Sequence, residues 1–280
     1  MNNLKNAIVI ATYNSLDEKK EYEVCIKTWK YYCDKHNIEL HLLKGNKNVE
    51  YNGEIRDDHA SMCYDRWLEI NFSPLEYNRI TFVDADTIIR WDAFDFNKVF
   101  DENNLEIAVV HDQSGPGTPP YHFNQWLKFN PEIYSFVKGF FNAGFVSMKV
   151  EYLEKFQKAL LPYKNYYFTE KDIDGYVEGI GKKGGVRIDA MDNTAICIVL
   201  QELYGDKISW IPKTFNLQLS YIYPGKKGWI FWEDWNEFTK LINTFEFVNE
   251  AMIYHLGGIL LHKGNTAELF WNNFKKYYNE

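Results

Sequence analysis

The opening of the chain has the pattern of one β-α-β unit, and this feature limits the possible folds more than any other. Residues 6–14 (NAIVIATYN) form a continuous apolar run closed by polar residues, which is typical of a strand buried on both faces of a parallel sheet. Apolar side chains then recur at helical spacing in residues 18–37, and residues 38–44 (IELHLLK) return to a strand pattern. Two strands joined by a crossover helix predict an α/β domain with parallel strands.

Strand and helix patterns continue to alternate after this unit. Further strands are predicted over residues 77–86, 106–112 and 139–150. Further helices are predicted over residues 59–71, 150–163 and 189–205. A last strand and turn are predicted over residues 251–258. The alternation favours an α/β fold with an open, Rossmann-like, mainly parallel sheet flanked by helices.

The composition is that of a globular protein with an acidic balance of charge. Apolar residues make up 46% of the chain and charged residues 25%, which is enough apolar material for a large core. The 31 basic residues against 39 acidic ones give a net charge of −8, which argues against a broad surface for nucleic acid or anionic membrane. The aromatic content of 18% fits either a thick aromatic core or surfaces that stack on carbohydrate.

Cysteine usage and hydropathy bear on where the protein is expected to work. The four cysteines have neither C-x-x-C spacing nor the arrangement of a disulfide framework, so we expect reduced and mostly buried thiols. No apolar run reaches the roughly 20 residues of a transmembrane segment, and the N-terminal apolar run is too short for a signal peptide. We therefore expect a cytoplasmic protein without a transmembrane segment.

Asp84 and Asp86 form a D-x-D pair directly after the apolar run of residues 77–83. Ligands of parallel α/β sheets bind outside the carboxyl ends of the strands, and these aspartates lie at such an end. In an extended segment, residues two apart point to the same side, so both carboxylates would face one point. Two close carboxylates repel unless a cation lies between them, and hard oxygen ligands suit Mg²⁺ or Mn²⁺. The pair therefore indicates either a metal site or a polar turn.

Three further features each have two interpretations. Asn142 and Gly144 interrupt a predicted strand, which indicates either the close approach of a ligand or another backbone, or a β-bulge. Asp192 and Asn193 begin a predicted helix, where both residue types are common caps. His255 lies at the end of a predicted strand, shortly before two glycines, and such a histidine is either a ligand or a structural residue.

Taken in order, these pieces resemble the GT-A nucleotide-sugar glycosyltransferases, and most of all the glycogenin-like retaining enzymes, from residue 7 to about 264. Ala11-Thr12-Tyr13 resembles the segment that holds the nucleotide base, and YDRWLEI (64–70) with Arg66 resembles the basic helix ahead of the D-x-D strand. The remaining matches are VDADTIIRWDAFDF (83–96), FNAGF (141–145), MDNTAI (191–196), WIPKTFNLQ (210–218) and IYHLGG (253–258) with the later Lys263.

The resemblance implies a fold, a cofactor and a set of site residues. It implies one GT-A domain over residues 1–280, with a nucleotide-binding half at 1–112 and an acceptor and sugar-pocket half at 113–280. Asp84, Asp86 and His255 would bind Mn²⁺ or Mg²⁺, and Asp192 and Asn193 would be the catalytic pair. The residues expected to bind the donor are Ala11, Thr12, Tyr13, Arg66, Asp84, Ala85, Asn142, Ala143, Gly144, Gly258 and Lys263.

The implied reaction transfers a sugar from a nucleotide diphosphate sugar, expected to be a UDP-sugar, to an acceptor hydroxyl with retention. The acceptor stays open among a glycan, a lipid, a protein side chain and a modified nucleobase, and so does the oligomeric state. The chain departs from the family pattern at Asn193, where the family has Gln, and after Lys263, where it lacks the Pro-Trp pair. The alternatives are a nucleotidyltransferase, disfavoured because no glycine follows the first strand directly, and a catalytically inactive sugar- or nucleotide-binding protein.

Overall fold

The predicted β-α-β unit is present at the start of the chain. The computed structural model describes residues 4–13, 19–45, 48–51, 54–57, 59–112, 135–166, 191–219, 251–256 and 266–279. Strand β1 (Lys5–Ala11), helix α1 (Lys20–His36) and strand β2 (Glu39–Leu43) follow one another, and β1 pairs with β2 in parallel. Helix α1 ends where Asn37 takes a left-handed conformation, which asparagine tolerates well.

The main sheet has six strands in the order β2-β1-β5-β8-β7-β9. Its other members are β5 (Tyr77–Val83), β7 (Ile107–His111), β8 (Phe141–Lys149) and β9 (Ile208–Ile211). Strand β8 is antiparallel to both neighbours, whereas the other five strands run in one direction. Strand β8 runs backwards because it starts at the edge where β7 ends, with the Asp112 amide donating to the Phe140 carbonyl at 3.0 Å. The expected mainly parallel sheet is therefore confirmed, with one reversed strand.

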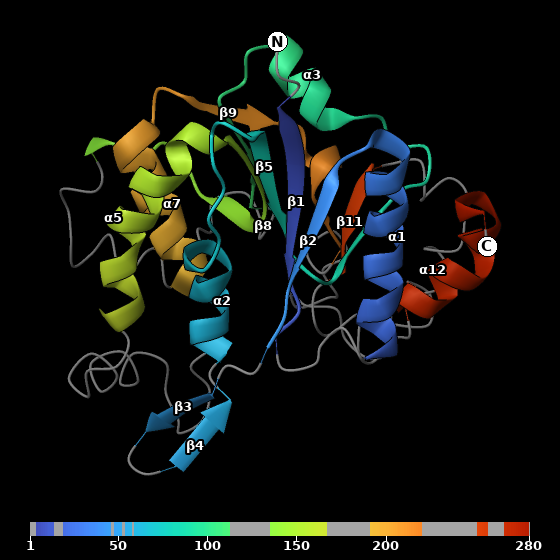
Figure 1. Ribbon diagram of the computed structural model, residues 1–280, viewed down its shortest axis with the longest axis horizontal. Helices are drawn as coiled ribbons and strands as arrows, with labels where there is room; N and C mark the ends of the chain where they lie inside the picture. The colour runs from blue at the N-terminus through green and yellow to red at the C-terminus, as the bar shows by residue number, and fades with distance from the viewer. Residues whose placement is uncertain are drawn as a thin grey trace, which may run out of the picture.

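Helices cover both faces of this sheet (Figure 1). Helices α2 (His59–Leu68), α5 (Leu153–Tyr166) and α7 (Met191–Tyr204) lie on one face, and α1 lies on the other with α12 (Thr266–Phe274) packed against it. Side chains of β1 alternate between the two cores: Val9 packs beneath α2, and Ile10 packs beneath α1. Both are buried, which explains why this strand is a continuous apolar run.

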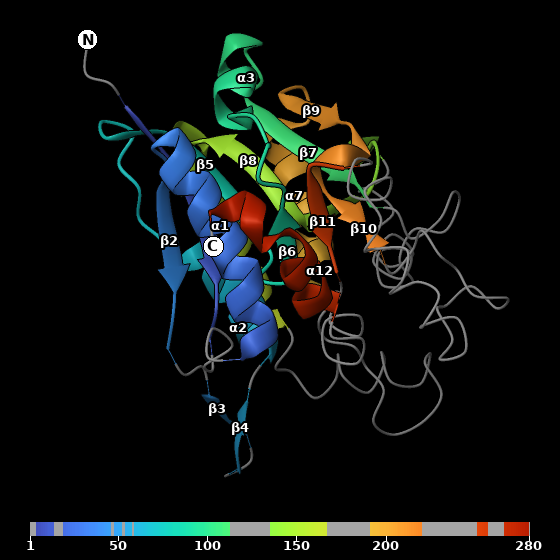
Figure 2. The ribbon, with the colours of Figure 1, turned by 90° about the vertical axis from the view of Figure 1, so that its right-hand side faces the viewer.

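A second, three-stranded sheet has the order β10-β11-β6. Strand β6 (Thr87–Ile89) follows the D-x-D pair, and it pairs in antiparallel fashion with β11 (Ile253–His255), so that His255 lies opposite Thr87. Figure 2 shows β6 and β11 next to α12. Strands β6 and β10 (Leu217–Gln218) have three and two residues, too few for a periodic signal, and the sequence did not predict them. Helix α12 was not predicted either.

The smaller elements complete the described part of the chain. They are β3 (Asn48–Tyr51), β4 (Glu54–Asp57), α3 (Phe96–Glu102) and the 3₁₀ turns η3 (Val150–Tyr152), η5 (Lys213–Phe215) and η6 (Lys275–Tyr278). The predicted helix over residues 59–71 ends early, at Leu68, and the one predicted over 150–163 begins as η3 and continues to Tyr166.

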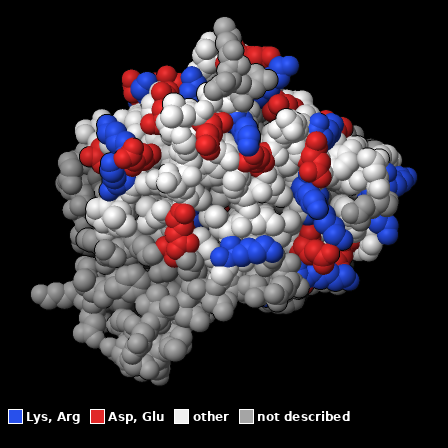
Figure 3. Space-filling view, in the orientation of Figure 1, with Lys and Arg blue, Asp and Glu red and all other residues white. Residues whose placement is uncertain are grey.

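The cysteines and the surface charges of the described residues can be compared with the sequence. All four cysteines are free and three of them are buried, as expected. On the face shown in Figure 3, basic and acidic side chains of the described residues are interspersed, without a large area of one sign. No helix in the described part of the chain is long and apolar enough to cross a bilayer.

Candidate metal centre

The three residues predicted as metal ligands lie together. One ligand atom from each of Asp84, Asp86 and His255 falls within 4.8 Å of the others. The His255 Nε2 atom is 3.5 Å from Asp84 Oδ2 and 3.3 Å from Asp86 Oδ1. All three side chains are mostly buried and keep partial exposure to solvent. Two carboxylates and an imidazole form a donor set that suits Mn²⁺ and related divalent cations.

A turn, not an extended strand, aims the two carboxylates. Strand β5 ends at Val83, and the Thr87 amide donates to the Asp84 carbonyl at 3.2 Å, which closes a turn over Asp84-Ala85-Asp86. The two carboxylates converge as expected, but a turn brings them together and not the period-two geometry of an extended segment. The polar turn and the candidate ligand pair, treated as alternatives in the sequence, are therefore the same segment.

Strand pairing delivers His255 to this turn. Strand β11 pairs with β6, and the Leu256 amide donates to the Asp86 carbonyl at 2.9 Å. The histidine is thus held by backbone hydrogen bonds that begin at the D-x-D turn itself. The Nδ1 atom of His255 is buried and has no hydrogen-bond partner among the described residues.

Charges around the cluster favour a cation there. Arg66 on α2 forms an ion pair with Asp84 Oδ1, while Oδ2 of Asp84 faces His255. Burial lowers the pKa of the His255 imidazole, but the carboxylates of Asp86, Asp84 and Asp112 outweigh that effect and raise this pKa to about 9. A group of carboxylates that raises the pKa of an imidazole is an environment that holds positive charge, whether a proton or a metal ion supplies it.

Gly144 leaves the space that the cluster occupies. A Cβ atom at Gly144 would lie 2.6 Å from Asp84 Oδ2, 2.6 Å from Asn142 Oδ1 and 2.7 Å from His255 Cε1. The pairing of β7 with β8 shifts its register between Val109 and His111, which is opposite this segment. The interruption seen in the sequence is therefore a bulge and also a close approach, and the Gly144 carbonyl accepts a hydrogen bond from the Asp84 amide at 3.2 Å.

The Asn142 amide organises the wall beside the cluster. Its Oδ1 accepts from the Gly144 amide at 2.8 Å and from Asn216 Nδ2 at 2.9 Å, and its Nδ2 donates to Asp112 Oδ2 at 3.3 Å. Asn193 on α7 accepts a hydrogen bond from the Ala143 amide at 2.5 Å. Asp112 and Asn216 were not among the predicted site residues. The position of Asp112 at the carboxyl end of a predicted strand was the signal that could have identified it.

The other predicted residues are distributed as follows. Thr12 and Tyr13 follow β1 at the same edge of the sheet, where the Thr12 amide donates to the Leu43 carbonyl at 2.7 Å and the Tyr13 hydroxyl donates to Glu69 Oε2 at 3.1 Å. Ala11 is the last residue of β1, and Ala85 is inside the D-x-D turn. The side chain of Asp192 and the whole of Gly258 and Lys263 lie outside the described residues.

The chain is similar to known proteins in backbone and not in sequence. No protein-family model matches it, and no curated protein matches it. The crystal structure of a glycosyltransferase involved in the glycosylation of the major capsid of PBCV-1 is similar at a TM-score of 0.52 and 10% identity, over 94% of this chain and 99% of that chain.

Two further glycosyltransferase structures are more distant in backbone. Apo mouse xyloside xylosyltransferase 1 has a TM-score of 0.42 at 10% identity, over 91% of this chain and 98% of that one. The apo bifunctional glycosyltransferase WbbM has a TM-score of 0.44 at 12% identity, over 97% of this chain and 52% of that one. A TM-score below 0.5 does not establish a shared fold. The likeness to the PBCV-1 enzyme, at 10% identity, shows the fold alone. The expected α/β, GT-A-like fold is confirmed on that basis.

Proposed function

We propose that this protein is a metal-dependent glycosyltransferase that moves a sugar from a nucleotide diphosphate sugar, expected to be a UDP-sugar, to an acceptor hydroxyl with retention. The proposal rests on the cluster of Asp84, Asp86 and His255 against Gly144. This cluster lies at the edge of the main sheet, in a chain whose fold is similar to that of a glycosyltransferase. Fold alone does not define an activity, so the chemistry of these residues has to support it.

The residues of the cluster fit a divalent cation. Asp84, Asp86 and His255 would hold Mn²⁺ or Mg²⁺ through oxygen and nitrogen atoms that converge on one point. A bound divalent ion supplies electrostatic stabilisation for the negative charge that develops on the leaving diphosphate. Arg66, which pairs with Asp84, would add a positive charge beside the same group.

The proposed reaction exchanges one C–O bond for another at the anomeric carbon. The bond from the sugar to the diphosphate oxygen breaks, and its electron pair leaves with the nucleoside diphosphate. The acceptor oxygen forms the new bond on the face that the diphosphate leaves, so the anomeric configuration is retained. A diphosphate oxygen takes up the proton of the acceptor hydroxyl. The wall formed by Asn142, Gly144 and Asn193 would orient the sugar, with Asp192 positioning donor or acceptor. The acceptor is proposed only as a hydroxyl compound, in a cytoplasmic setting.

Purified protein provides the test. A panel of nucleotide sugars with Mn²⁺ should raise the melting temperature and yield free nucleoside diphosphate for at least one donor. Asp86→Asn, which keeps the size of the side chain and removes its charge, should lose both effects. Asp92→Asn is the matched control, because Asp92 follows β6 and pairs with Arg90, away from the cluster. Absence of any shift with every donor would refute the proposal, and binding without turnover would indicate an inactive sugar-binding protein.

A further inference from the structure

Hydrogen bonds between two fully buried residues, Trp29 on α1 and Thr87 on β6, link helix α1 to the D-x-D turn. The Thr87 hydroxyl donates to the Asp84 carbonyl at 2.6 Å, and Trp29 Nε1 donates to the same hydroxyl at 2.9 Å and to the Thr87 carbonyl at 3.2 Å. Trp29 and Thr87 are 0% exposed, so neither can contact a donor or acceptor directly.

The chemistry of the three groups sets the direction of this chain of hydrogen bonds. An indole N–H is only a donor, and a carbonyl oxygen is only an acceptor. The single proton of the Thr87 hydroxyl must therefore point at the Asp84 carbonyl whenever Trp29 donates to the hydroxyl oxygen. Without the indole, the hydroxyl would lose the partner that holds it in this orientation.

The same carbonyl already accepts the hydrogen bond that closes the turn. The Asp84 carbonyl thus accepts hydrogen bonds from the Thr87 amide at 3.2 Å and from the Thr87 hydroxyl at 2.6 Å. These two bonds restrain the backbone from which the Asp84 carboxylate extends. Helix α1 holds β6 at a second point, because the Ile89 amide donates to Thr28 Oγ1 at 3.2 Å. The turn is therefore attached to a long helix and is not free to relax by itself.

We infer that Trp29 and Thr87 are positioning residues that hold the metal-binding turn in its ligating geometry. The inference rests on the proposed function, since it assigns a role toward the divalent ion of that site. Groups outside the direct ligands that orient metal-binding side chains commonly change metal affinity by 10- to 100-fold when removed. The hydroxyl of Thr87 acts through the Asp84 backbone, and Trp29 acts through that hydroxyl.

Mn²⁺ binding in the absence of any donor measures this role directly. The electron paramagnetic resonance signal of free Mn²⁺ would be followed as protein is added, and the melting temperature would be recorded in parallel in EDTA. Thr87→Val, which replaces the hydroxyl by a methyl group of similar size, should weaken Mn²⁺ binding about tenfold or more. Thr87→Ser should restore affinity close to that of the wild type, and Trp29→Phe should weaken binding by a smaller factor.

Thr81→Val is the matched control. Thr81 on β5 is also 0% exposed, and its hydroxyl bonds Asn97 Oδ1 on α3 at 2.9 Å and Ser147 Oγ on β8 at 2.8 Å, and neither partner belongs to the cluster. This variant should lower the melting temperature and leave Mn²⁺ affinity unchanged.

The outcomes separate the two proposals. If wild-type protein binds no Mn²⁺, the proposed function is wrong. If it does, and Thr87→Val and Trp29→Phe bind equally well, the positioning role is wrong while the metal site stands. Should Thr87→Val fail to fold, Trp29→Phe decides alone, because it keeps an aromatic ring in the same space and removes only the donor and part of the ring.

Discussion

Gly144 on β8 lies so close to the D-x-D turn that a Cβ atom there would be 2.6 Å from Oδ2 of Asp84. The same atom would meet His255 Cε1 at 2.7 Å, so a methyl group would push apart two of the three candidate ligands. These side chains are held by other contacts and cannot both move away at low cost.

Gly144→Ala should therefore weaken Mn²⁺ binding by at least tenfold and destabilise the fold by about 1–3 kcal/mol, as is typical of overpacking. Gly139→Ala is the control, because its methyl group would meet the Trp210 ring at 3.0 Å, outside the cluster. Both variants should lose stability in urea titrations, and only Gly144→Ala should lose Mn²⁺ affinity. Unchanged affinity in Gly144→Ala would show that the space at Gly144 is not needed for the ion.

Replacing Asn142 by Asp should make stability depend on pH. The new carboxylate would still accept the hydrogen bond from the Gly144 amide. It would, however, put an oxygen beside Asp112 Oδ2, to which Asn142 Nδ2 donates at 3.3 Å in the wild type. Repulsion raises the pKa of one of the two acids in the folded state above its unfolded value. The loss of stability should thus be full at neutral pH and shrink as the pH falls through the raised folded-state pKa toward the unfolded value of about 4. Melting temperatures between pH 4 and 8 would check this, and an offset independent of pH would contradict it.

Arg79 should be needed for stability and not for metal binding. Its side chain is 0% exposed, and its Nε and Nη2 atoms are each 2.9 Å from Asp101 Oδ1. Arg79→Met would leave the Leu105 carbonyl without this donor and Asp101 with only its hydrogen bond from Asn78 Nδ2 at 2.6 Å, so we expect a loss of about 2–4 kcal/mol in unfolding free energy. Lys98→Met, which breaks the exposed Lys98–Glu102 pair, should cost under about 1 kcal/mol. Urea titrations measure both, and equal losses would contradict the prediction.

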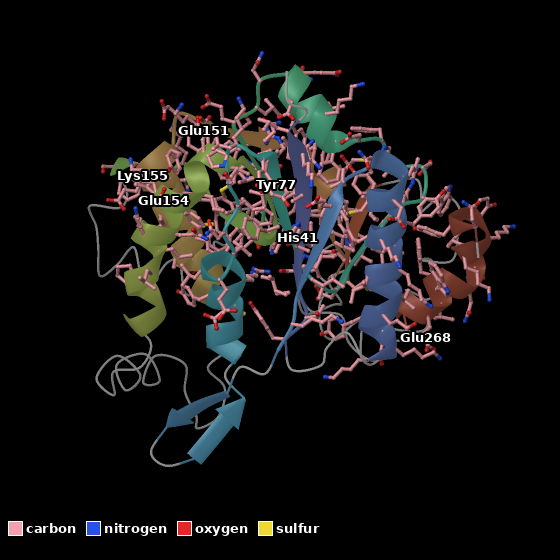
Figure 4. The ribbon with its side chains drawn as sticks, in the orientation of Figure 1. His41, Tyr77, Glu151, Glu154, Lys155 and Glu268 are labelled. Atoms are coloured by element: carbon pink, nitrogen blue, oxygen red, sulfur yellow. The ribbon has the colours of Figure 1, made fainter. Side chains whose placement is uncertain are left out.

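Glu39 should contribute stability that disappears in acid. Its carboxylate bonds Lys5, Tyr77 and His41, and these hydrogen bonds, with Lys5 first, lower its pKa to about 2 despite partial burial (Tyr77 and His41 are labelled in Figure 4). A folded-state pKa below the unfolded value gives stability that is present at neutral pH and is lost as pH falls from about 4.5 toward 2. The side chain is 38% exposed, so solvent screening limits the effect to about 1 kcal/mol or less.

Glu39→Gln should consequently have a slightly lower melting temperature than wild type at pH 7. The difference should narrow steadily as the pH is lowered to 3, which paired thermal melts would record. Curves that stay parallel over this range would show that the carboxylate's charge contributes nothing.

The amino-acid sequence by itself determined the local elements and the edge at which the site lies. Continuous apolar runs and helical spacing are properties of neighbouring residues, so the opening β-α-β unit and the run that ends just before Asp84 could be predicted without knowing the fold. The interruption at Gly144 was visible for the same reason, since glycine and asparagine are poor residues for a buried strand.

Only the tertiary structure decided how these pieces meet. That β8 runs backwards between β5 and β7, that a turn aims Asp84 and Asp86, and that Asn216 reaches Asn142 all depend on pairings between residues far apart in the chain. Strand β11 was predicted within residues 251–258, but only its pairing with β6 places His255 at the turn. Local patterns follow from the geometry of one segment, whereas these contacts follow from how buried surfaces and hydrogen bonds are satisfied across the whole fold.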